Sequence, residues 1–404
     1  MDNDNKNVVR VGSRKSELAL IQTNYVIDCL KKLYPHMEFT IVTMTTLGDR
    51  ILNVSLPKIG EKSLFTKDLE DALRSNTVDF VVHSLKDLPT SLPEGLAIGA
   101  VFEREDPRDA LVLREDVKDC TLATLPAGSV IGTSSLRRTA QLRGGYPQLS
   151  IVDVRGNLNT RLRKLDAPTR EYSALLLASA GLQRMGWKDR ISKVLPCSEM
   201  KYAVGQGALA VECRVDNDNI LQMLAAYNHA ETYCRVLAER SFLKTLGGGC
   251  SAPVGVSTSL KPFEGNYKLS ITGCVWSLDG QTKIDHKMEQ TFAQIKRTTK
   301  HKLSPEEEGS SKKIKEEEIR SKEDNLIHPL AELDKKILEK KSCEDVKEKR
   351  IFCGLSENMS VPIDVIIKCE NLGRDLAEAL IEKGALEVMK VTQDLIRSSI
   401  EKSS

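Results

Sequence analysis

Arginine side chains gather at points where an expected strand gives way to an expected helix. The set consists of Arg14, Arg137, Arg138, Arg155, Arg161 and Arg184. Each guanidinium group is a planar fork that can bind a carboxylate or a phosphate through two parallel hydrogen bonds. Thr133, Ser134 and Ser135 precede one of these helices, where free backbone N–H groups also favour anions. The pattern indicates a site for a ligand that carries several negative groups.

A second candidate group follows the apolar strand VDFVVHS. The stretch VVHSLKDLPT presents Ser84, Lys86 and Asp87 before a proline closes the turn. A carboxylate beside a lysine at the end of a strand could move protons or stabilise a developing cation. A polar turn in which Lys86 and Asp87 simply pair is an equally good interpretation of this stretch alone. His83 by itself indicates a packed or hydrogen-bonded side chain rather than a catalyst.

One cysteine stands among small residues in the stretch LGGGCSAPVG. Glycines let the backbone approach a ligand closely and adopt positive φ angles. No histidine or acidic partner at a catalytic spacing accompanies Cys250, so the motif gives weak support to a protease-like nucleophile. From this stretch alone, an inert cysteine in a bend is the better interpretation.

The elements that must position these groups alternate between strands and helices over the first half of the chain. VVRVGS, FTIVTM and VDFVVHS are expected strands, and Ser16 is the expected cap of the helix that follows the first. This alternation is typical of a mostly parallel sheet covered by helices. The layout restarts after residue 105 with SVIGTSSLRRTAQL, LSIVDVRGNLNTRLRKL and YSALLLASAG. We therefore expect two analogous α/β domains with a cleft between them.

The pattern changes from residue 229 onward. AETYCRVLAERSFLKTL is an expected helix capped by Asn228, and YKLSITGCVWSLDGQTKI is an expected hairpin that turns at Asp279 and Gly280. The Lys- and Glu-rich segment 294–350 predicts a disordered or loosely helical insertion, either a solvated loop or a partner-binding segment. The tail LGRDLAEALIEKGALEVM is an expected amphipathic helix that returns to a small third domain.

Composition excludes several classes of protein. A chain of 404 residues with 40% hydrophobic content predicts two or three globular domains, and a net charge of +2 argues against a polyanion-coating protein. No apolar run is long enough to span a bilayer, and the start MDNDNKNVVRVG resembles neither a signal nor a transit peptide. The 10 cysteines are scattered, without CxxC or zinc-like spacing, which favours a reducing compartment and no structural metal.

These features together resemble the porphobilinogen deaminase family, also called the hydroxymethylbilane synthase family. The matching stretches occur in family order and cover nearly all of residues 8–290. They are VGSRKSELALIQT, GEKSLFTKDLEDAL, DFVVHSLKDLPT, GTSSLRRTAQL, VRGNLNTRLRKLD, AGLQRMGW, VGQGALAVECR and GGGCSAPVG. The resemblance does not extend through the charged segment 294–350.

The resemblance implies a fold class and a domain order. The fold is α/β, with two periplasmic-binding-protein-like domains around a cleft and a smaller α+β C-terminal domain. Domain 1 would comprise residues 1–104 and 205–228, domain 2 residues 105–204, and domain 3 residues 229–404 with the insertion at 294–350. Domain 1 is then discontinuous, which the order of strands and helices alone does not indicate.

The resemblance also implies an activity. The family's enzymes are transferases of haem and tetrapyrrole biosynthesis that join four porphobilinogen molecules, release ammonia and then release hydroxymethylbilane by hydrolysis. The product grows on a dipyrromethane cofactor, held by a thioether to the cysteine that matches Cys250. Asp87 would stabilise the cationic stages and assist proton transfer. Each pyrrole carries an acetate and a propionate, which would account for the many arginines, and no metal or nucleotide is implied.

The match assigns the other candidate residues to cofactor and substrate. Arg14, Ser16 and Arg184 would line the side on which porphobilinogen enters. The resemblance further implies a monomeric, cytoplasmic enzyme without nucleic-acid or membrane partners. Cofactor contacts are expected from Ser84, Lys86, Thr133, Ser134, Ser135, Arg137, Arg138, Arg155, Gly156 and Arg161, and near the hinge from Gln206 and Gly207.

Two other function classes compete with this hypothesis. A non-catalytic anion-binding or sensing protein would keep the arginine-lined cleft but would have no use for Asp87 or a reactive Cys250. A nucleic-acid-binding module could use the basic stretch SLRRTAQLRGG. The near-neutral charge and the aromatic content of 4% argue against a nucleic-acid-binding module.

Overall fold

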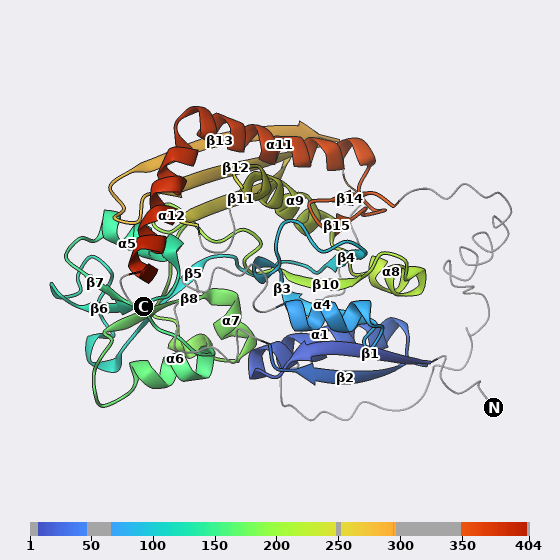
Figure 1. Ribbon diagram of the computed structural model, residues 1–404, viewed down its shortest axis with the longest axis horizontal. Helices are drawn as coiled ribbons and strands as arrows, with labels where there is room; N and C mark the ends of the chain where they lie inside the picture. The colour runs from blue at the N-terminus through green and yellow to red at the C-terminus, as the bar shows by residue number, and fades with distance from the viewer. Residues whose placement is uncertain (1–6, 47–65, 248–251, 294, 296–348, 402–404) are drawn as a thin grey trace, which may run out of the picture. The chain divides into compact units, whose positions relative to one another are not determined.

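The computed structural model describes residues 7–46, 66–247, 252–293, 295 and 349–401 (Figure 1). Cys250 and almost all of the expected insertion at 294–350 lie outside the described residues. Three β-sheets organise the described part of the chain, and helices pack against each of them.

The first sheet has the strand order β14-β15-β4-β10-β3-β1-β2. The strand β1 runs parallel to β2 and β3, whereas β10 is antiparallel to both β3 and β4. Apolar side chains alternate across the sheet, so that Val82 packs toward α1 and Val81 packs toward α4. The elements are β1 (Val8–Arg14), α1 (Glu17–Leu33), β2 (Glu38–Met44), α4 (Lys67–Arg74), β3 (Phe80–Ser84), the 3₁₀ turn η1 (Leu85–Asp87), β4 (Leu96–Val101), β10 (Leu209–Arg214), α8 (Asp218–Ala225), β14 (Ile351–Phe352) and β15 (Leu355–Ser356).

The second sheet has the order β7-β6-β8-β5-β9. The strand β6 is parallel to β7 and β8, and β5 is antiparallel to β8 and β9. Residues 102–108 and 195–208 connect this sheet to the first one. The elements are β5 (Asp109–Leu113), η2 (Glu115–Val117), β6 (Val130–Gly132), α5 (Leu136–Gly145), β7 (Ser150–Val152), α6 (Leu158–Leu165), β8 (Ala174–Ala178), α7 (Ser179–Arg184), η3 (Lys188–Arg190) and β9 (Lys193–Val194).

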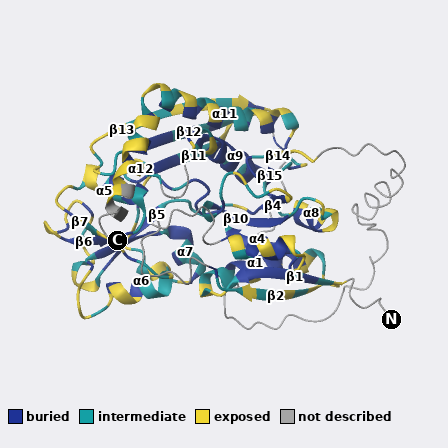
Figure 2. Ribbon diagram, viewed as in Figure 1, coloured by how far each residue is buried: buried dark blue, intermediate teal, exposed yellow. Residues whose placement is uncertain are grey.

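The third sheet is antiparallel, with the order β11-β12-β13. The helix α9 (Ala230–Thr245) packs against β11, β12 and α11 and is buried over most of its length. Figure 2 shows exposed residues along the outer side of α11 and buried residues on β11 and β12. The other elements are β11 (Val254–Phe263), β12 (Asn266–Trp276), β13 (Lys283–Phe292), α11 (Ile363–Glu382) and α12 (Ala385–Glu401). Together these elements form a mixed α/β protein with a smaller C-terminal α+β part.

The structure confirms most of the expected elements and corrects two details. The hairpin β12–β13 turns through Gly280, which has a φ of +75°, as expected. Asn228 does not cap α9; His229 does, because its side chain accepts a hydrogen bond from the backbone N–H of Thr232. The side chain of Asn228 instead accepts a hydrogen bond from Val101 N–H at 3.1 Å.

The tail also differs from the expected single helix. It forms two helices, α11 and α12, because Gly384 adopts a φ of +89° that an α-helix cannot accommodate. Ser16 does occupy the N-cap position of α1, although its side chain makes no capping hydrogen bond. Among the described residues, none of the helices has the length and apolar character required to cross a membrane.

Candidate functional site

Several of the expected site residues lie at or directly after the carboxyl ends of parallel strands in the first two sheets. Arg14 ends β1, Ser84 ends β3, and Thr133 directly follows β6. The starts of α1 and α6 lie side by side, since Asn159 donates a hydrogen bond to Glu17 at 2.7 Å. Ligands of open α/β sheets bind in the crevice outside such strand ends. The strand ends therefore bring the junction arginines and the residues of the stretch VVHSLKDLPT to one region.

A buried aspartate anchors two of the arginines. Arg137 Nη1 and Arg138 Nη2 each lie 2.7 Å from one carboxylate oxygen of Asp109. Burial opposes the ionisation of Asp109, but the charges of Arg137 and Arg138 outweigh burial and hold its pKa well below the usual range. Arg138 also donates to the carbonyl of Leu176 at 2.8 Å, and Arg137 to that of Lys201. Both guanidinium groups are thus fixed before any ligand arrives.

The segments that connect the two sheets meet at the same aspartate. Gln206 Nε2 donates to Asp109 at 2.8 Å and to the carbonyl of Pro107 at 2.7 Å. Gly207 has a φ of +87°, and a Cβ there would lie 2.7 Å from the carbonyl oxygen of Glu105, so only glycine fits. Arg184 donates to Glu105 at 2.9 Å and to the Gly207 carbonyl at 2.8 Å. Gln206 and Gly207 therefore bind the two connections to each other.

The turn that carries Asp87 lies within electrostatic reach of the arginines. Burial lowers the pKa of Lys86; the charge of Asp87 opposes this shift, and Arg138 adds to it. Asp87 is half-buried and its charge acts on Lys86 and Arg161, but its carboxylate takes part in no hydrogen bond or ion pair with other described residues. The Asp87 carboxylate is therefore held among cations without being bound to one of them.

Arg161 and Arg155 complete a group that we call the arginine cluster: Arg137, Arg138, Arg155 and Arg161. The pKa of Arg161 is lowered to about 10, mainly by burial and further by the charges of Arg138 and Arg155. The charges of Asp153 and Asp87 partly offset this shift. Arg161 is oriented by a 2.8 Å hydrogen bond from its Nε to the Gly156 carbonyl. Three nitrogens of the cluster, Nε of Arg137, Nε of Arg138 and Nη1 of Arg155, are buried without a hydrogen-bond partner in the described part of the chain.

The remaining candidate residues hold the strand ends in place. Ser84 receives a hydrogen bond from Gln22 at 3.1 Å, and Ser134 donates to the carbonyl of Val154 at 2.5 Å. Ser135 caps α5 by accepting a hydrogen bond from Arg138 N–H, and Thr133 is buried beside it. These hydroxyl groups therefore shape the loops around the cluster. Arg14 and Ser16 lie at the β1–α1 junction, as expected.

His83 points away from this region. It is buried, and its Nε2 lies 2.9 Å from a carboxylate oxygen of Glu212 on the neighbouring strand β10. Glu70 of α4 is buried nearby, where burial raises its pKa. The prediction that His83 is a packed histidine is confirmed.

Sequence reasoning missed Asp109, although it organises the site. The available signal was a charged residue at the start of DALVL, a strand whose residues are all buried. A buried carboxylate must be paired, and the junction arginines were the available partners. Arg104 and Glu239, a buried pair with a 2.6 Å contact, were also missed.

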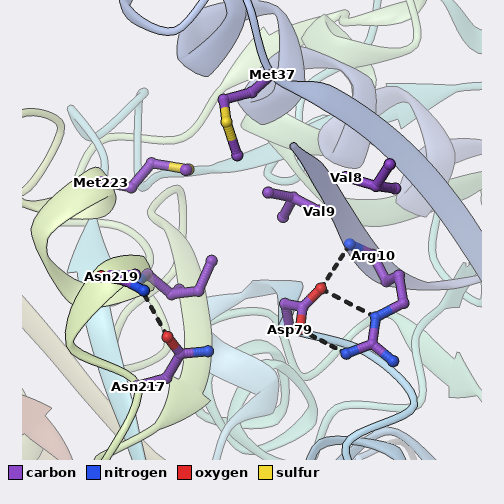
Figure 3. A pocket seen from close by; sticks show the side chains of 9 residues that line it. Val8, Val9, Arg10, Met37, Asp79, Asn217, Asn219 and Met223 are labelled. Atoms are coloured by element: carbon purple, nitrogen blue, oxygen red, sulfur yellow. Dashed lines mark hydrogen bonds and ion pairs between the residues drawn. The ribbon is translucent and has the colours of Figure 1, made fainter. Parts of the chain in front are cut away.

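A separate cavity of about 410 Å³ lies at the opposite ends of the same strands (Figure 3). Its lining includes Arg10 and Asp79, which form an ion pair at 2.7 Å, together with Met37 and Met223. None of the expected site residues that the structure describes is among the residues that line it. The cavity is therefore distinct from the candidate site.

Comparison with protein-family models identifies two matching regions. Residues 9–222 match the family described as "Porphobilinogen deaminase, dipyromethane cofactor binding domain". Residues 233–302 match "Porphobilinogen deaminase, C-terminal domain". The first match contains the arginine cluster and Asp87, and the second contains Cys250.

Curated relatives give the same family. A porphobilinogen deaminase of Synechococcus elongatus is 58% identical over 273 residues, which cover 68% of this chain and 83% of that protein. One from a Nostoc species is 55% identical over 279 residues, covering 69% and 84% respectively. Among solved structures, the periplasmic aliphatic sulphonate binding protein SsuA from Escherichia coli aligns with a TM-score of 0.32 and 13% identity, over 60% of this chain and 76% of that one. That structural likeness is too slight to carry an argument.

Proposed function

The chain belongs to the porphobilinogen deaminase family, and from this premise we propose which of its own residues perform each part of the reaction. The enzyme joins porphobilinogen molecules head to tail, with loss of ammonia, and releases hydroxymethylbilane. Its first family domain binds a dipyrromethane cofactor. When bound, this cofactor supplies the pyrrole carbon to which the first porphobilinogen is joined.

The arginine cluster fits the carboxylates of such a cofactor, and this observation carries the proposal. The unpartnered nitrogens of Arg137, Arg138 and Arg155 are buried. A buried donor without an acceptor costs free energy, whereas an acetate or propionate would supply charge-assisted hydrogen bonds. We assign Arg137, Arg138, Arg155 and Arg161 to the carboxylates of the cofactor and the growing chain.

Asp87 is the catalytic residue of this proposal. Each condensation needs a base for the proton that leaves the attacking pyrrole carbon and a negative charge near the pyrrole nitrogens. The Asp87 carboxylate accepts that proton at one of its Oδ atoms and stabilises the cationic stages. Its support is its place in the turn η1 directly after β3, among cations and outside any hydrogen bond or ion pair between described residues.

The other candidate residues divide between cofactor and substrate. We assign Arg14, Ser16 and Arg184 to the incoming porphobilinogen, because they lie at or near the ends of strands and helices on the α1 and α7 side. Cys250, outside the described residues, is proposed as the point of covalent attachment on the basis of its motif. Cofactor contacts are assigned also to Ser84, Lys86, Thr133, Ser134, Ser135, Gly156, Gln206 and Gly207.

Replacing Arg155 with leucine tests the assignment of the cluster. We expect Arg155→Leu to reduce kcat/KM for porphobilinogen by about 10- to 100-fold, the loss of one or two charge-assisted hydrogen bonds. The melting temperature should not fall, because Arg155 Nη1 has no hydrogen-bond partner among the described residues. Steady-state kinetics and thermal unfolding measure the two effects separately.

Arg143→Leu is the matched control. Arg143 lies on α5 with Arg137 and Arg138, but it is exposed and donates to the carbonyl of Leu278 at 2.9 Å. The Arg143→Leu variant should keep the wild-type kcat/KM for porphobilinogen. Equal losses in Arg155→Leu and Arg143→Leu would contradict the assignment, as would normal kinetics in both.

We also propose a monomeric enzyme that acts in the cytoplasm without nucleic-acid or membrane partners. The domain boundaries 1–104 with 205–228, 105–204 and 229–404 remain part of this proposal. Three separate sheets support three domains, although β14 and β15 extend the first sheet from a segment late in the chain. Sedimentation of the purified enzyme would measure its oligomeric state.

A further inference from the structure

Arg240 is a buried cation that lies outside the arginine cluster. It belongs to α9, and 1% of its surface is exposed. Its guanidinium group donates to three backbone carbonyls: Cys353 at 2.8 Å, Leu88 at 3.3 Å and Pro89 at 2.6 Å. Burial of a guanidinium group is costly unless its hydrogen bonds are well placed. The position of its acceptors therefore indicates what Arg240 does.

Two of the three acceptors belong to the residues that directly follow Asp87. Leu88 and Pro89 end the turn that begins with η1. Within this turn, the backbone N–H of Leu88 bonds to the carbonyl of Leu85 at 3.1 Å. A single 3₁₀ turn is a weak element by itself. Contacts from outside must therefore hold the backbone that carries Asp87.

The same helix supports the start of the turn through the residue next to Arg240. Glu239 accepts a hydrogen bond from the backbone N–H of Gly205 at 2.9 Å. Gly205 packs closely on Leu85, since a Cβ added to Gly205 would lie 2.9 Å from Leu85 Cγ. Leu85 N–H in turn donates to the carbonyl of Ala208 at 2.9 Å. Consecutive residues of α9 thus hold the turn, Arg240 directly at its end and Glu239 through Gly205 at its start.

We infer that Arg240 is a positioning residue for the reaction, which fixes the backbone of residues 85–89 to α9 and so places the Asp87 carboxylate. The inference rests on the proposed role of Asp87. Fixing the turn to α9 would serve the reaction, because α9 ends at Thr245, shortly before Cys250 in the sequence. One helix then relates the catalytic turn to the part of the chain that carries the cysteine.

Substitutions of Arg240 should affect turnover more than substrate binding. We expect Arg240→Met to lower kcat by about 10- to 100-fold, because a displacement of about 1 Å at a catalytic group can cost that much. KM for porphobilinogen should stay within about threefold, since the described acceptors of Arg240, the carbonyls of Cys353, Leu88 and Pro89, belong to no residue assigned to the substrate. Arg240→Lys, which keeps one donor group, should recover part of kcat. Kinetics are measured well below the melting temperature of each variant, which thermal unfolding supplies.

Arg235→Met is the control on the same helix. Arg235 also donates to a neighbouring strand, at 3.2 Å to both the hydroxyl and the carbonyl of Thr258, but it does not touch the turn. The Arg235→Met variant should keep the wild-type kcat even if its melting temperature falls. A purely structural role for Arg240 predicts the same pattern for Arg240→Met and Arg240→Lys, namely a lower melting temperature with normal kcat, and that result would overturn the inference.

A double-mutant cycle separates this inference from the role of Asp87. If Arg240 acts through Asp87, adding Arg240→Met to Asp87→Ala should lower kcat no further. Multiplicative losses would show that Arg240 acts elsewhere and would overturn the inference alone. Normal turnover in Asp87→Ala would instead overturn the proposed function of Asp87. If Arg240→Met does not fold, the cycle is run with Arg240→Lys.

Discussion

Replacing Asp87 with alanine should lower the turnover of porphobilinogen by about 10³-fold or more while the protein keeps its fold. Removing a proton-transfer group costs about 10²- to 10⁴-fold, and the lost negative charge beside a developing cation adds to that. Stability should change little, because the half-buried carboxylate makes no hydrogen bond or ion pair with the residues that the structure describes. The measurements are kcat with porphobilinogen and the thermal unfolding curve.

Asp153→Ala is the matched control for Asp87→Ala. Asp153 also offsets the lowered pKa of Arg161, but it is exposed and lies after β7. Its removal deletes the same charge near the same arginine without touching the turn after β3. Turnover should stay within about threefold of wild type. Normal turnover in Asp87→Ala, or equal losses in the two variants, would refute the role of Asp87.

Replacing Asp109 with asparagine should be the most destabilising single change at the site. The substitution keeps the shape of the side chain but leaves Arg137 and Arg138 buried without their counter-charge. Breaking a buried ion pair in this way costs about 3–5 kcal/mol in the free energy of unfolding. Denaturant unfolding at neutral pH measures the loss. Asp116→Asn is the control, since Asp116 also contacts two arginines, Arg114 and Arg170, but at the surface, and should cost clearly less.

The loss in Asp109→Asn should depend on pH in a defined direction. The folded state holds the pKa of Asp109 well below its unfolded value of about 3.9. The aspartate therefore contributes its full stabilisation above about pH 4, and the contribution disappears as the pH falls through the lower, folded pKa. The difference in stability between wild type and Asp109→Asn should be constant from pH 6 to 8 and shrink below about pH 4. A difference that grows toward acid pH would contradict the pairing.

Local sequence patterns were sufficient for the framework of the site. Hydrophobic periodicity, which is a short-range property, predicts the strands before Arg14, Asp87 and Arg138. It also predicts the helices that begin near these residues. Since strand ends collect at one edge of a parallel sheet, the arginines could be grouped before their contacts were known. The residues Thr133–Ser135 followed from the same pattern.

Long-range contacts explain what could not be predicted. Asp109 meets Arg137 across 28 residues, and Arg240 meets Leu88 across 152, so no local motif identifies either contact. The cap of α9 was misassigned for a related reason. Asn228 and His229 are adjacent candidates for the N-cap. Asn228 is not the cap because its side chain accepts a hydrogen bond from the N–H of Val101, which is distant in the sequence.

The role of Cys250 is beyond local inference in another way. Composition and spacing favoured an inert cysteine in a bend, and the covalent attachment follows only from the family motif GGGCSAPVG. In the proposed function, the arginine cluster gives that attachment a physical purpose, because the ligand assigned to the cluster is rich in carboxylates and one of its ends must stay fixed. Histidine or acidic partners are not required for a cysteine that forms one permanent bond.

The intact mass of the purified wild-type chain is the most direct test of this account. The account predicts that the active protein is heavier than its 44.9 kDa polypeptide by the mass of one dipyrromethane unit. Cys250→Ser should have the bare polypeptide mass and no activity. A wild-type protein that is fully active at the bare polypeptide mass would contradict the account.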